Sequence, residues 1–218
     1  MRNQKRRFYE KSLEILKSIR ILAETPHWIA VEKPPGWTVE PHPRYPSLVA
    51  WWRRERNDAF VGVVHRLDRP VSGIVLLAKK RSALRHLNDQ FARRRVQKFY
   101  EARTTAAPPA PRGKLQHFLR KNQPERRAEL TTEALGKRAE LRYRLLDETD
   151  GVYRLEVTLL TGRFHQIRAQ LAAAGAPILG DVTYGGADGF APNAIALRAV
   201  KLVFTDPATQ ERRVLKLE

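Results

Sequence analysis

The stretch from residue 60 to residue 78 reads FVGVVHRLDRPVSGIVLLA, and it organises the chain around it. Its two ends, residues 60–64 and 74–78, are short apolar runs rich in β-branched side chains, which predict two buried strands. The segment between them, His65 to Gly73, is polar and carries a single acidic side chain, Asp68. The pattern predicts a polar loop that is fixed at both ends by buried strands.

Turn residues, capping residues and apolar periodicity delimit further elements on either side of this loop. In chain order they are a strand at 29–31, a turn at 33–36, a helix from the cap Ser47 through Trp52, a helix from the cap Ser82 to Arg95, and a strand at 97–104. Strands and helices thus alternate within the first half of the chain, which predicts a compact mixed unit.

The second half is richer in strands. It contains a proline-rich linker at 106–111, a basic stretch without firm periodicity at 113–138, a hairpin of 141–145 and 153–159 around Asp150-Gly151, a helix at 164–174 closed by Gly175, and strands at 195–204 and 213–217 around Asp206-Pro207. We therefore expect an α+β fold, a mixed and mainly antiparallel β-sheet with flanking helices. It forms one domain over residues 21–218, preceded by a basic extension, residues 1–20, that is predicted to be helical.

The charge of the chain indicates its partner. There are 41 Lys and Arg against 23 Asp and Glu, a formal net charge of +18, and the sequence pI is about 10.8. Basic residues concentrate in segments 79–103 and 112–144, where aromatic side chains are interleaved with them. Such a surface suits a nucleic acid, because Lys and Arg release condensed counterions and aromatic faces stack on unpaired bases. The alternative is a solvated basic surface that binds nothing in particular.

Composition also excludes several kinds of reactive site and of membrane-bound or secreted protein. The 218 residues contain no cysteine, so disulfides, thiolate nucleophiles and zinc–thiolate sites are absent. Lys or Arg interrupts every apolar run before it reaches the ~18–20 residues of a membrane span, and the N-terminus lacks the apolar core of a secretion signal. We expect a cytoplasmic protein with no membrane partner.

Asp68 is the candidate centre of the chemistry. It lies between Arg66 and Arg69 in a loop held by two strands, and these cations are expected to keep its carboxylate ionised. An ionised carboxylate suits a nucleophile better than a general acid, whose pKa must be raised by apolar burial. The alternative is a structural Asp that pairs with Arg66 or caps the turn at Ser72-Gly73.

Five blocks, in order, carry a resemblance to a known family. The run from His65 to Gly73 resembles the His-Arg-Leu-Asp signature of the RluA-type pseudouridine synthases. Four further blocks resemble other elements of that family: Val31-Glu32-Lys33-Pro34-Pro35-Gly36, Lys98-Phe99-Tyr100-Glu101-Ala102, Thr161-Gly162-Arg163-Phe164-His165-Gln166-Ile167-Arg168, and Gly180-Asp181 with Tyr184-Gly185. The likeness runs from about residue 20 to residue 204. It resembles the short form, without the family's small N-terminal RNA-binding domain.

The resemblance implies isomerisation of uridine to pseudouridine in a structured RNA, tRNA or rRNA, by a monomer without cofactor or metal. By similarity Asp68 is the nucleophile, attacking the ribose or the uracil ring; Tyr100 stacks on the target base; and Arg168 pairs with the aspartate. Arg66 fills the gap left by the flipped uridine, and His65 assists flipping, a step that costs a few kcal/mol of unstacking. The remaining RNA-binding candidates are Arg69, Arg163 and His165.

The chain departs from the family pattern at a few positions. Val71 replaces the usual Thr, Pro70 a common acidic residue and Phe164 a Thr or Ser, while Ala169-Gln170 stands for Val-His or Val-Arg. Two alternatives therefore stay open. One is a catalytically impaired RNA-binding or remodelling protein of the same fold. The other is a nuclease or glycosylase that combines Asp68 with a second carboxylate or a metal, for which no tight Asp, Glu and His spacing is visible.

Overall fold

The structure is a computed structural model that describes residues 19–57 and 59–217. The helix expected in the basic extension falls on residues 1–18 and so lies outside the described part. The first half contains β1 (Ile21–Glu24), β2 (Trp28–Lys33), α2 (Leu48–Glu55), β3 (Gly62–Val63), β4 (Ser72–Ala78), α3 (Arg81–Ala92) and β5 (Gln97–Thr104). The second half contains β6 (Arg112–Asn122), β7 (Arg127–Thr131), β8 (Lys137–Thr149), β9 (Val152–Leu159), α4 (Gln166–Ala173), the 3-10 turn η1 (Val182–Tyr184), β10 (Leu197–Thr205) and β11 (Arg212–Lys216).

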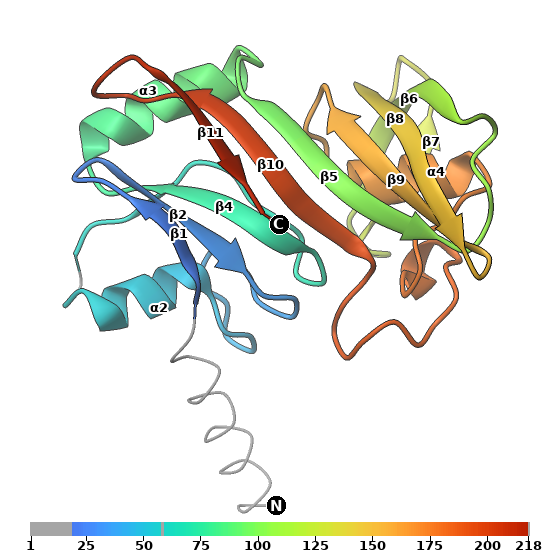
Figure 1. The fold of residues 1–218 in the computed structure, drawn as a ribbon, viewed down its shortest axis with the longest axis horizontal. Coiled ribbons are helices and arrows are strands. Elements are labelled where there is room, and N and C mark those ends of the chain that lie inside the picture. Colours follow the sequence, from blue (N-terminus) through green and yellow to red (C-terminus); the bar gives the residue numbers. More distant parts are fainter. Residues whose placement is uncertain (1–18, 58, 218) are drawn as a thin grey trace, which may run out of the picture.

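All strands of the described residues join one sheet, in the order β1-β2-β4-β10-β5-β9-β8-β6-β7, with β11 beside β10 and β3 beside β4. Within this sheet β4 and β10 are parallel, and the other pairs are antiparallel. Figure 1 shows α2 and α3 beside the β1–β2–β4 half and α4 beside the β8–β9 half. The expected α+β class with a mainly antiparallel sheet is confirmed.

Strands β2 and β4 are buried on both faces, which explains their nearly continuous apolar sequences. Ile29 and Val75 point into a core shared with the tryptophans of α2 and with Ile167 of α4. The alternate residues, such as Ala30 and Leu76, face a second core that α3 covers. The polar loop between β3 and β4 therefore leaves and re-enters a sheet that is packed on two sides.

The parallel pairing of β4 with β10 requires a glycine at position 73. Gly73 has a φ of +114°, and a Cβ placed on it would lie 2.3 Å from the carbonyl oxygen of Ala199. Since no side chain fits there, glycine at this position lets β10 run parallel against β4 directly after the Asp68 loop. The turn expected at Ser72-Gly73 was wrong, because the pair begins strand β4.

Several expected boundaries were right and others were wrong. Strand β5 and the hairpin of β8 and β9 are confirmed; Asp150 and Gly151, with φ of 52° and 72°, form the turn. The interpretation of residues 113–138 as a stretch without firm periodicity was wrong, because these residues form β6, β7 and the start of β8. Helix α3 starts at Arg81 after the cap residue Lys80, so Ser82 is not its cap. Helix α4 begins only at Gln166, after the turn that starts at Thr161.

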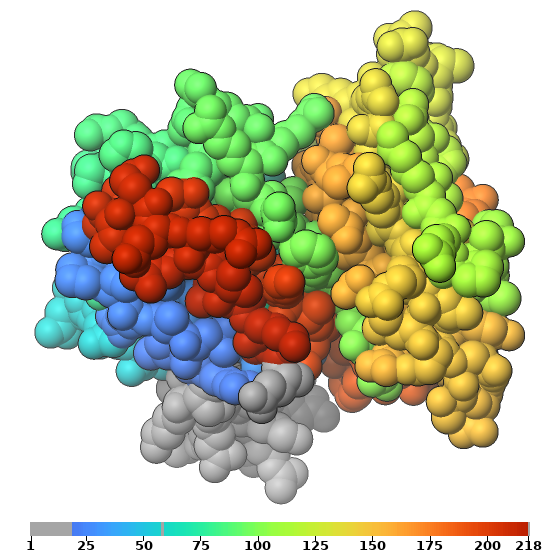
Figure 2. All heavy atoms as spheres, turned by 45° about the horizontal axis from the view of Figure 1, so that its top comes forward, coloured from blue at the N-terminus to red at the C-terminus, as the bar shows by residue number. Residues whose placement is uncertain are grey.

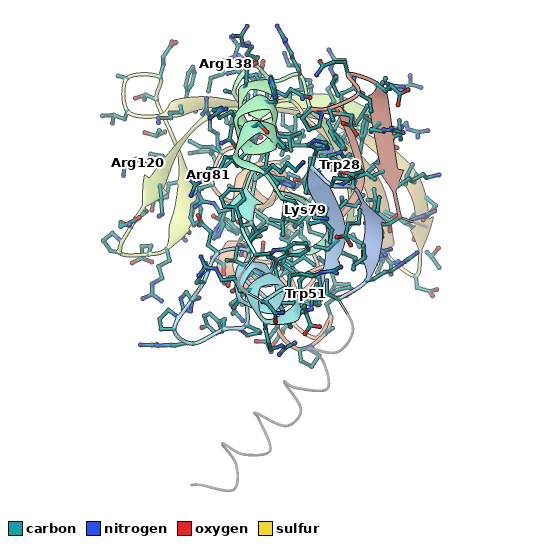
Figure 3. The ribbon with its side chains drawn as sticks, turned by 90° about the vertical axis from the view of Figure 1, so that its left-hand side faces the viewer. Trp28, Trp51, Lys79, Arg81, Arg120 and Arg138 are labelled. Carbon is teal, nitrogen blue, oxygen red and sulfur yellow. The ribbon has the colours of Figure 1, made fainter. Side chains whose placement is uncertain are left out.

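Basic side chains are spread over the second half of the sheet and around α3. Figure 3 shows Arg81, Arg120 and Arg138 at separate places on the molecule, and the three residues belong to α3, β6 and β8. Many of these cations have acidic neighbours, such as Glu129 beside Arg120 and Glu140 beside Arg138. No helix among the described residues is long and apolar enough to cross a membrane.

Candidate active site

A cleft of about 640 Å³ opens where the Asp68 loop, the end of α3, β5 and the turn before α4 meet. Figure 2 shows the surface hollowed between the green atoms around α3 and the yellow and orange atoms of the other half. Seven of the eight site residues predicted from the sequence line this cleft: His65, Arg66, Asp68, Tyr100, Arg163, His165 and Arg168. Arg69 does not. It lies over the ring of Tyr45 and donates to Asn193 Oδ1.

Backbone hydrogen bonds hold the loop that carries Asp68. The carbonyl of Asp68 accepts from Val71 N, that of Arg69 from Gly36 N, and that of Pro70 from Ile195 N. Gly36 and Ile195 belong to segments far from the loop in the sequence, so the loop is fixed by the tertiary structure and not by its own turn alone. Such support matters for a reactive group, because small displacements of a catalytic side chain cost rate.

Lys33 belongs to the site, although its motif, residues 31–36, predicted no role for it. Its side chain is fully buried, and its ammonium donates to the carbonyls of Pro34, Trp37 and Arg69 at 2.9, 2.9 and 3.2 Å. Burial lowers the pKa of Lys33 to about 7, while Asp68 opposes that shift. Lys33 thus fastens the Asp68 loop to the turn after β2 and places a cation near the carboxylate.

Arg168 connects two carboxylates. Its Nε and Nη2 atoms donate to Asp181 at 2.6 and 2.7 Å, and its Nη1 lies 3.6 Å from Asp68 Oδ2. The Arg168 side chain is 5% exposed and that of Asp181 is 1% exposed, whereas Asp68 is 26% exposed and faces the cleft. Asp181 therefore fixes the guanidinium so that one nitrogen remains for Asp68. The sequence feature that could have identified Asp181 as a site residue was its place in the Gly180-Asp181 block.

The environment of Asp68 differs from the one expected. The pKa of its carboxyl is raised above the ordinary value, because burial outweighs the opposing effects of Arg168 and Lys33, and the expectation that cations hold the pKa of Asp68 down was wrong. The expected cations were the wrong ones, since Arg66 pairs with Glu40 at 2.8 Å and Arg69 points away. Sequence neighbours in an irregular loop point in different directions, so the cations that favour the ionised form of Asp68 come from β2 and α4 instead.

His165 lies beside Asp68 in a strained backbone conformation. It precedes α4 with a φ of 49°, stacks on Phe164, and its Nε2 lies 3.8 Å from Asp68 Oδ2. Its Nδ1 lies 3.0 Å from the hydroxyl of Tyr184, which accepts a hydrogen bond from Ala128 N. The same hydroxyl also donates to the carbonyl of Ala128 at 3.4 Å, so Tyr184 ties the His165 ring to β7. Burial lowers the pKa of His165 to about 3, so the ring is neutral at pH 7.

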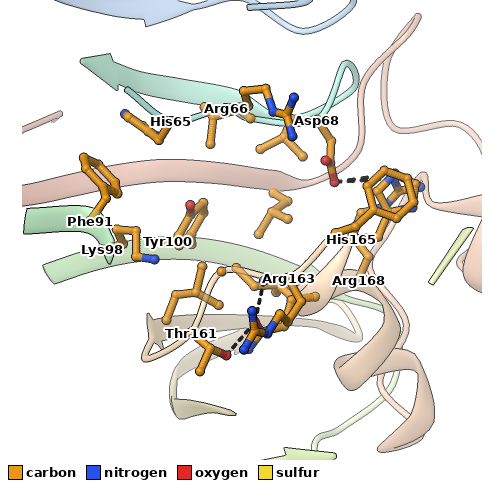
Figure 4. A pocket seen from close by; sticks show the side chains of 18 of the residues that line it. His65, Arg66, Asp68, Phe91, Lys98, Tyr100, Thr161, Arg163, His165 and Arg168 are labelled. Atoms are coloured by element: carbon orange, nitrogen blue, oxygen red, sulfur yellow. Dashed lines mark hydrogen bonds and ion pairs between the residues drawn. The ribbon is translucent and has the colours of Figure 1, made fainter. Parts of the chain in front are cut away.

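Tyr100 and His65 line the part of the cleft near Lys98 and Phe91 (Figure 4). Tyr100 is 7% exposed, and burial, with Asp68 adding to it, raises the pKa of its hydroxyl well above the ordinary value. It is a neutral phenol at physiological pH. His65 accepts a hydrogen bond from Leu76 N through Nε2 and stacks on Phe91. Burial, followed by Lys98, lowers the pKa of His65 to about 3.

Gln166 orders the turn before α4. Its side-chain oxygen accepts from Thr161 Oγ1 and from the backbone N–H of Arg163, and its amide nitrogen donates to the carbonyl of Glu140. The side chain of Arg163 in turn donates through Nε to the carbonyl of Arg138. These contacts place Arg163 at the edge of the cleft with part of its guanidinium open to solvent.

The departures from the family pattern sit in identifiable environments. Val71 is 2% exposed and packs in the core beside the cleft, where an apolar side chain fits without an unpaired hydroxyl. Gln170 is fully buried and donates to the carbonyls of Leu115 and Ala139, which ties α4 to the sheet. Phe164 is 38% exposed, with Lys121 over its ring.

No group of three or more His, Asp or Glu side chains in the described ranges, 19–57 and 59–217, is placed to hold a metal ion.

Comparison with known proteins decides the family. The profile of the family described as RNA pseudouridylate synthase matches residues 27–173, more than half of the chain. The chain belongs to this family. The resemblance inferred from the five motifs is confirmed, and the matched region of this pseudouridylate synthase family member includes Asp68, Tyr100 and Arg168.

Relatives and solved structures agree with this assignment. An uncharacterized RNA pseudouridine synthase of Chloroflexus aurantiacus is 38% identical over 167 residues, which are 70% of this chain and 50% of that protein. The ribosomal large subunit pseudouridine synthase C of Escherichia coli is 34% identical over 211 residues, with 91% of this chain and 65% of that protein covered. The chain thus spans about half to two thirds of the length of these relatives.

The structure of human RNA pseudouridylate synthase domain containing 1 superposes with a TM-score of 0.79 at 23% identity, covering 93% of this chain and 84% of that one. This likeness supports the pseudouridine synthase fold.

Proposed function

We propose that the protein isomerises uridine to pseudouridine in the RNA of the large ribosomal subunit, with Asp68 as the nucleophile. The observation that carries the proposal is the meeting of Asp68, Tyr100 and Arg168 in one cleft of a family member. The three side chains come from a loop, a strand and a helix that are up to 100 residues apart in the sequence. A carboxylate, a fixed cation and an aromatic wall are the parts that the reaction needs.

The chemistry is balanced without a second reactant. An oxygen of Asp68 forms a bond to carbon, either C1′ of the ribose or the uracil ring, and is released again later in the reaction. The C1′–N1 bond breaks, the uracil rotates, and a C1′–C5 bond forms. The hydrogen at C5 is lost as a proton and N1 gains a proton, so the product has the same composition as the substrate.

The surroundings of Asp68 suit a nucleophile that is partly desolvated. Arg168, held by Asp181, stabilises the carboxylate before and after the covalent step, and Lys33, whose pKa burial lowers to about 7, adds a second positive charge when it is protonated. Partial burial keeps water from competing with the substrate for Asp68. Tyr100 remains a neutral phenol, so its contribution is to stack on the uracil and to donate a hydrogen bond, rather than to act as a base.

Access to the cleft requires the uridine to leave its helix. Arg66 lies at the rim with 68% of its side chain exposed, and among the described residues its only ion-pair partner is the exposed carboxylate of Glu40. Because that pair is solvated and weak, Arg66 can exchange Glu40 for the RNA and occupy the gap left by the flipped base. His65, by contrast, is fixed by Leu76 N and Phe91, and it contributes a rigid wall.

The large-subunit target is proposed from the relatives whose printed names carry it, which are 32–34% identical to this chain. The net charge of +18 supports binding to a large folded RNA. The intact Asp68, Arg168 and Tyr100 argue against the catalytically impaired alternative.

The test is to map pseudouridine in large-subunit RNA from cells that lack the gene and from cells complemented with the wild type or Asp68→Asn. We expect at least one uridine to be modified with the wild type and unmodified with Asp68→Asn. Equal maps in all strains would refute the large-subunit target. Restoration by Asp68→Asn would refute the nucleophile.

A further inference from the structure

The cleft extends beyond the reactive carboxylate. Figure 4 shows Asp68, His165 and Arg168 at one end, Tyr100 in the middle, and His65, Phe91 and Lys98 at the other end. All of these side chains line the same cavity, and Arg94 and Ala92 complete its far end. One uracil stacked on Tyr100 therefore leaves the end formed by α3 and the start of β5 unfilled.

Lys98 is the first sign that this end binds something anionic. Its side chain is partly buried, and no hydrogen bond or ion pair joins its ammonium to another described residue. Burial, followed by the charge of Arg94, lowers the pKa of Lys98 to about 8, which still leaves it mostly protonated at pH 7. A desolvated ammonium without an acidic partner is costly to the fold, and a bound anion would relieve that cost.

The chain makes room for this ammonium. A Cβ at Gly162 would lie 3.3 Å from Lys98 Nζ, so the glycine of the Thr161-Gly162-Arg163 turn allows the amine to lie against the backbone at the cleft wall. Arg94 shows a related feature. It adopts a left-handed φ of 57° at the end of α3, where glycine is favoured, and its side chain reaches the same cavity.

Two aromatic rings lie beside these cations. His65 and Phe91 stack at 4.9 Å with 17° between their planes, and both line the cleft. The bond from Leu76 N fixes the His65 ring, so the pair is a rigid, uncharged surface. Rigid aromatic surfaces next to cations are the combination that binds an unstacked base and its phosphate.

We propose that this end of the cleft is a second nucleotide subsite, in which the His65–Phe91 pair contacts the base next to the target uridine and Lys98, assisted by Arg94, binds a phosphate. The inference rests on the proposed function and specifies its substrate further: the enzyme holds two adjacent unstacked nucleotides, not one. The second nucleotide supplies binding energy at a distance from Asp68, which helps to offset the cost of unstacking.

The experiment compares Lys98→Met with Lys80→Met, which removes the same charge from an exposed position outside the cleft. Affinities for uridine 5′-monophosphate and for the trinucleotide UpUpU are measured by calorimetry, and Tm is measured for each variant. We expect the wild type and Lys80→Met to bind UpUpU at least tenfold more tightly than the monophosphate. Lys98→Met should lose most of that gain while its Tm rises by ~2–4 °C, because a buried unpaired charge is removed. Phe91→Leu should reduce the gain while the mononucleotide affinity is kept.

Three results would overturn the subsite. The first is equal affinity of the wild type for UpUpU and for the monophosphate. The second is a Lys98→Met variant that keeps the wild-type preference for UpUpU. The third is a Lys98→Met variant that loses this preference and also has a lowered Tm, which would indicate a structural role. Failure of the proposed function is read separately, from the pseudouridine content of a large-subunit RNA transcript after incubation with the wild type. A wild type that gains affinity for UpUpU but forms no pseudouridine would support the subsite and refute the isomerase.

Discussion

Asp181 holds Arg168 by two hydrogen bonds, of 2.6 Å to Nε and 2.7 Å to Nη2, in a position where neither side chain is more than 5% exposed. The pair is asymmetric in function, because only Arg168 reaches the cleft. Asp181 is a positioning residue that acts on Asp68 through the guanidinium. This arrangement orients a cation at Asp68, the proposed nucleophile, without neutralising it by a close two-point contact.

We expect Asp181→Asn to lower kcat more than tenfold while KM for RNA stays near the wild-type value. Without its anchor, Arg168 is free to close the 3.6 Å gap and pair fully with Asp68, which would occupy the carboxylate proposed as the nucleophile. Removing one partner of a buried pair also costs ~3–5 kcal/mol, so denaturant unfolding should show a large loss of stability. Asp188→Asn, in an exposed turn, is the matched control. A kcat for Asp181→Asn within twofold of the wild type, in protein that is still folded, would contradict the positioning role.

His65 makes stability depend on pH. The pKa of His65 is lowered from 6.5 to about 3, so below pH 6.5 the unfolded chain takes up a proton that the folded protein does not. Stability must therefore fall as the pH falls through this window, by ~2–3 kcal/mol at about pH 4.5. His65→Gln can still accept from Leu76 N without titrating, so its unfolding free energy should fall less over the same range. His86→Gln, on the exposed side of α3, should retain the wild-type slope. Parallel slopes for the wild type and His65→Gln would show that His65 titrates normally.

The sequence predicted elements best where one face is apolar and the other polar. Strand β5 was predicted with the bounds that the structure has, because its buried and half-exposed side chains alternate. Strands β6 and β7 were missed because their outer face is dense with Arg and Lys and their inner face is built from small or polar residues such as Gly113 and His117. The weak alternation of Leu115 and Leu119 was the available signal, and only pairing with β8 makes it decisive.

The sequence predicted which residues belong to the site, but it did not predict which residues contact one another there. Motifs identified Asp68, Tyr100 and Arg168, and the structure brings all three into one cleft. The partners that set their properties, Lys33 and Asp181, lie 35 and 113 residues from Asp68. Proximity across such distances follows from the order of strands in the sheet, which no local pattern encodes. For the same reason the flanking cations Arg66 and Arg69 were wrongly assigned to Asp68.

Gly73 is expected to tolerate no side chain. In Gly73→Ala the new Cβ would meet the Ala199 backbone at 2.3–2.8 Å, and backbone atoms of a central strand cannot move aside cheaply. We expect a loss of well over 3 kcal/mol, or insoluble protein, because β10 is displaced from β4. The control is Gly175→Ala, which has a φ of +79° but no atom within 4 Å of the new Cβ. It should cost only the ~1–2 kcal/mol of left-handed backbone strain. Similar unfolding free energies for the two variants would mean that contact with β10 is unimportant.

A variant of Arg66 should distinguish RNA binding from the base-flipping step that is proposed to follow it. Its side chain is exposed at the rim and carries one of many positive charges, so Arg66→Ala should weaken overall RNA binding by no more than a few-fold. In the proposed mechanism this one side chain fills the gap left by a flipped uridine, so single-turnover formation of pseudouridine should slow by at least tenfold in Arg66→Ala. Arg44→Ala, also on an exposed loop but outside the cleft, is the charge-matched control for binding. Binding measured by filter retention and single-turnover rates on the same transcript give the comparison. If Arg66→Ala loses affinity and rate by the same factor, Arg66 is a phosphate contact like its neighbours and does not act after docking.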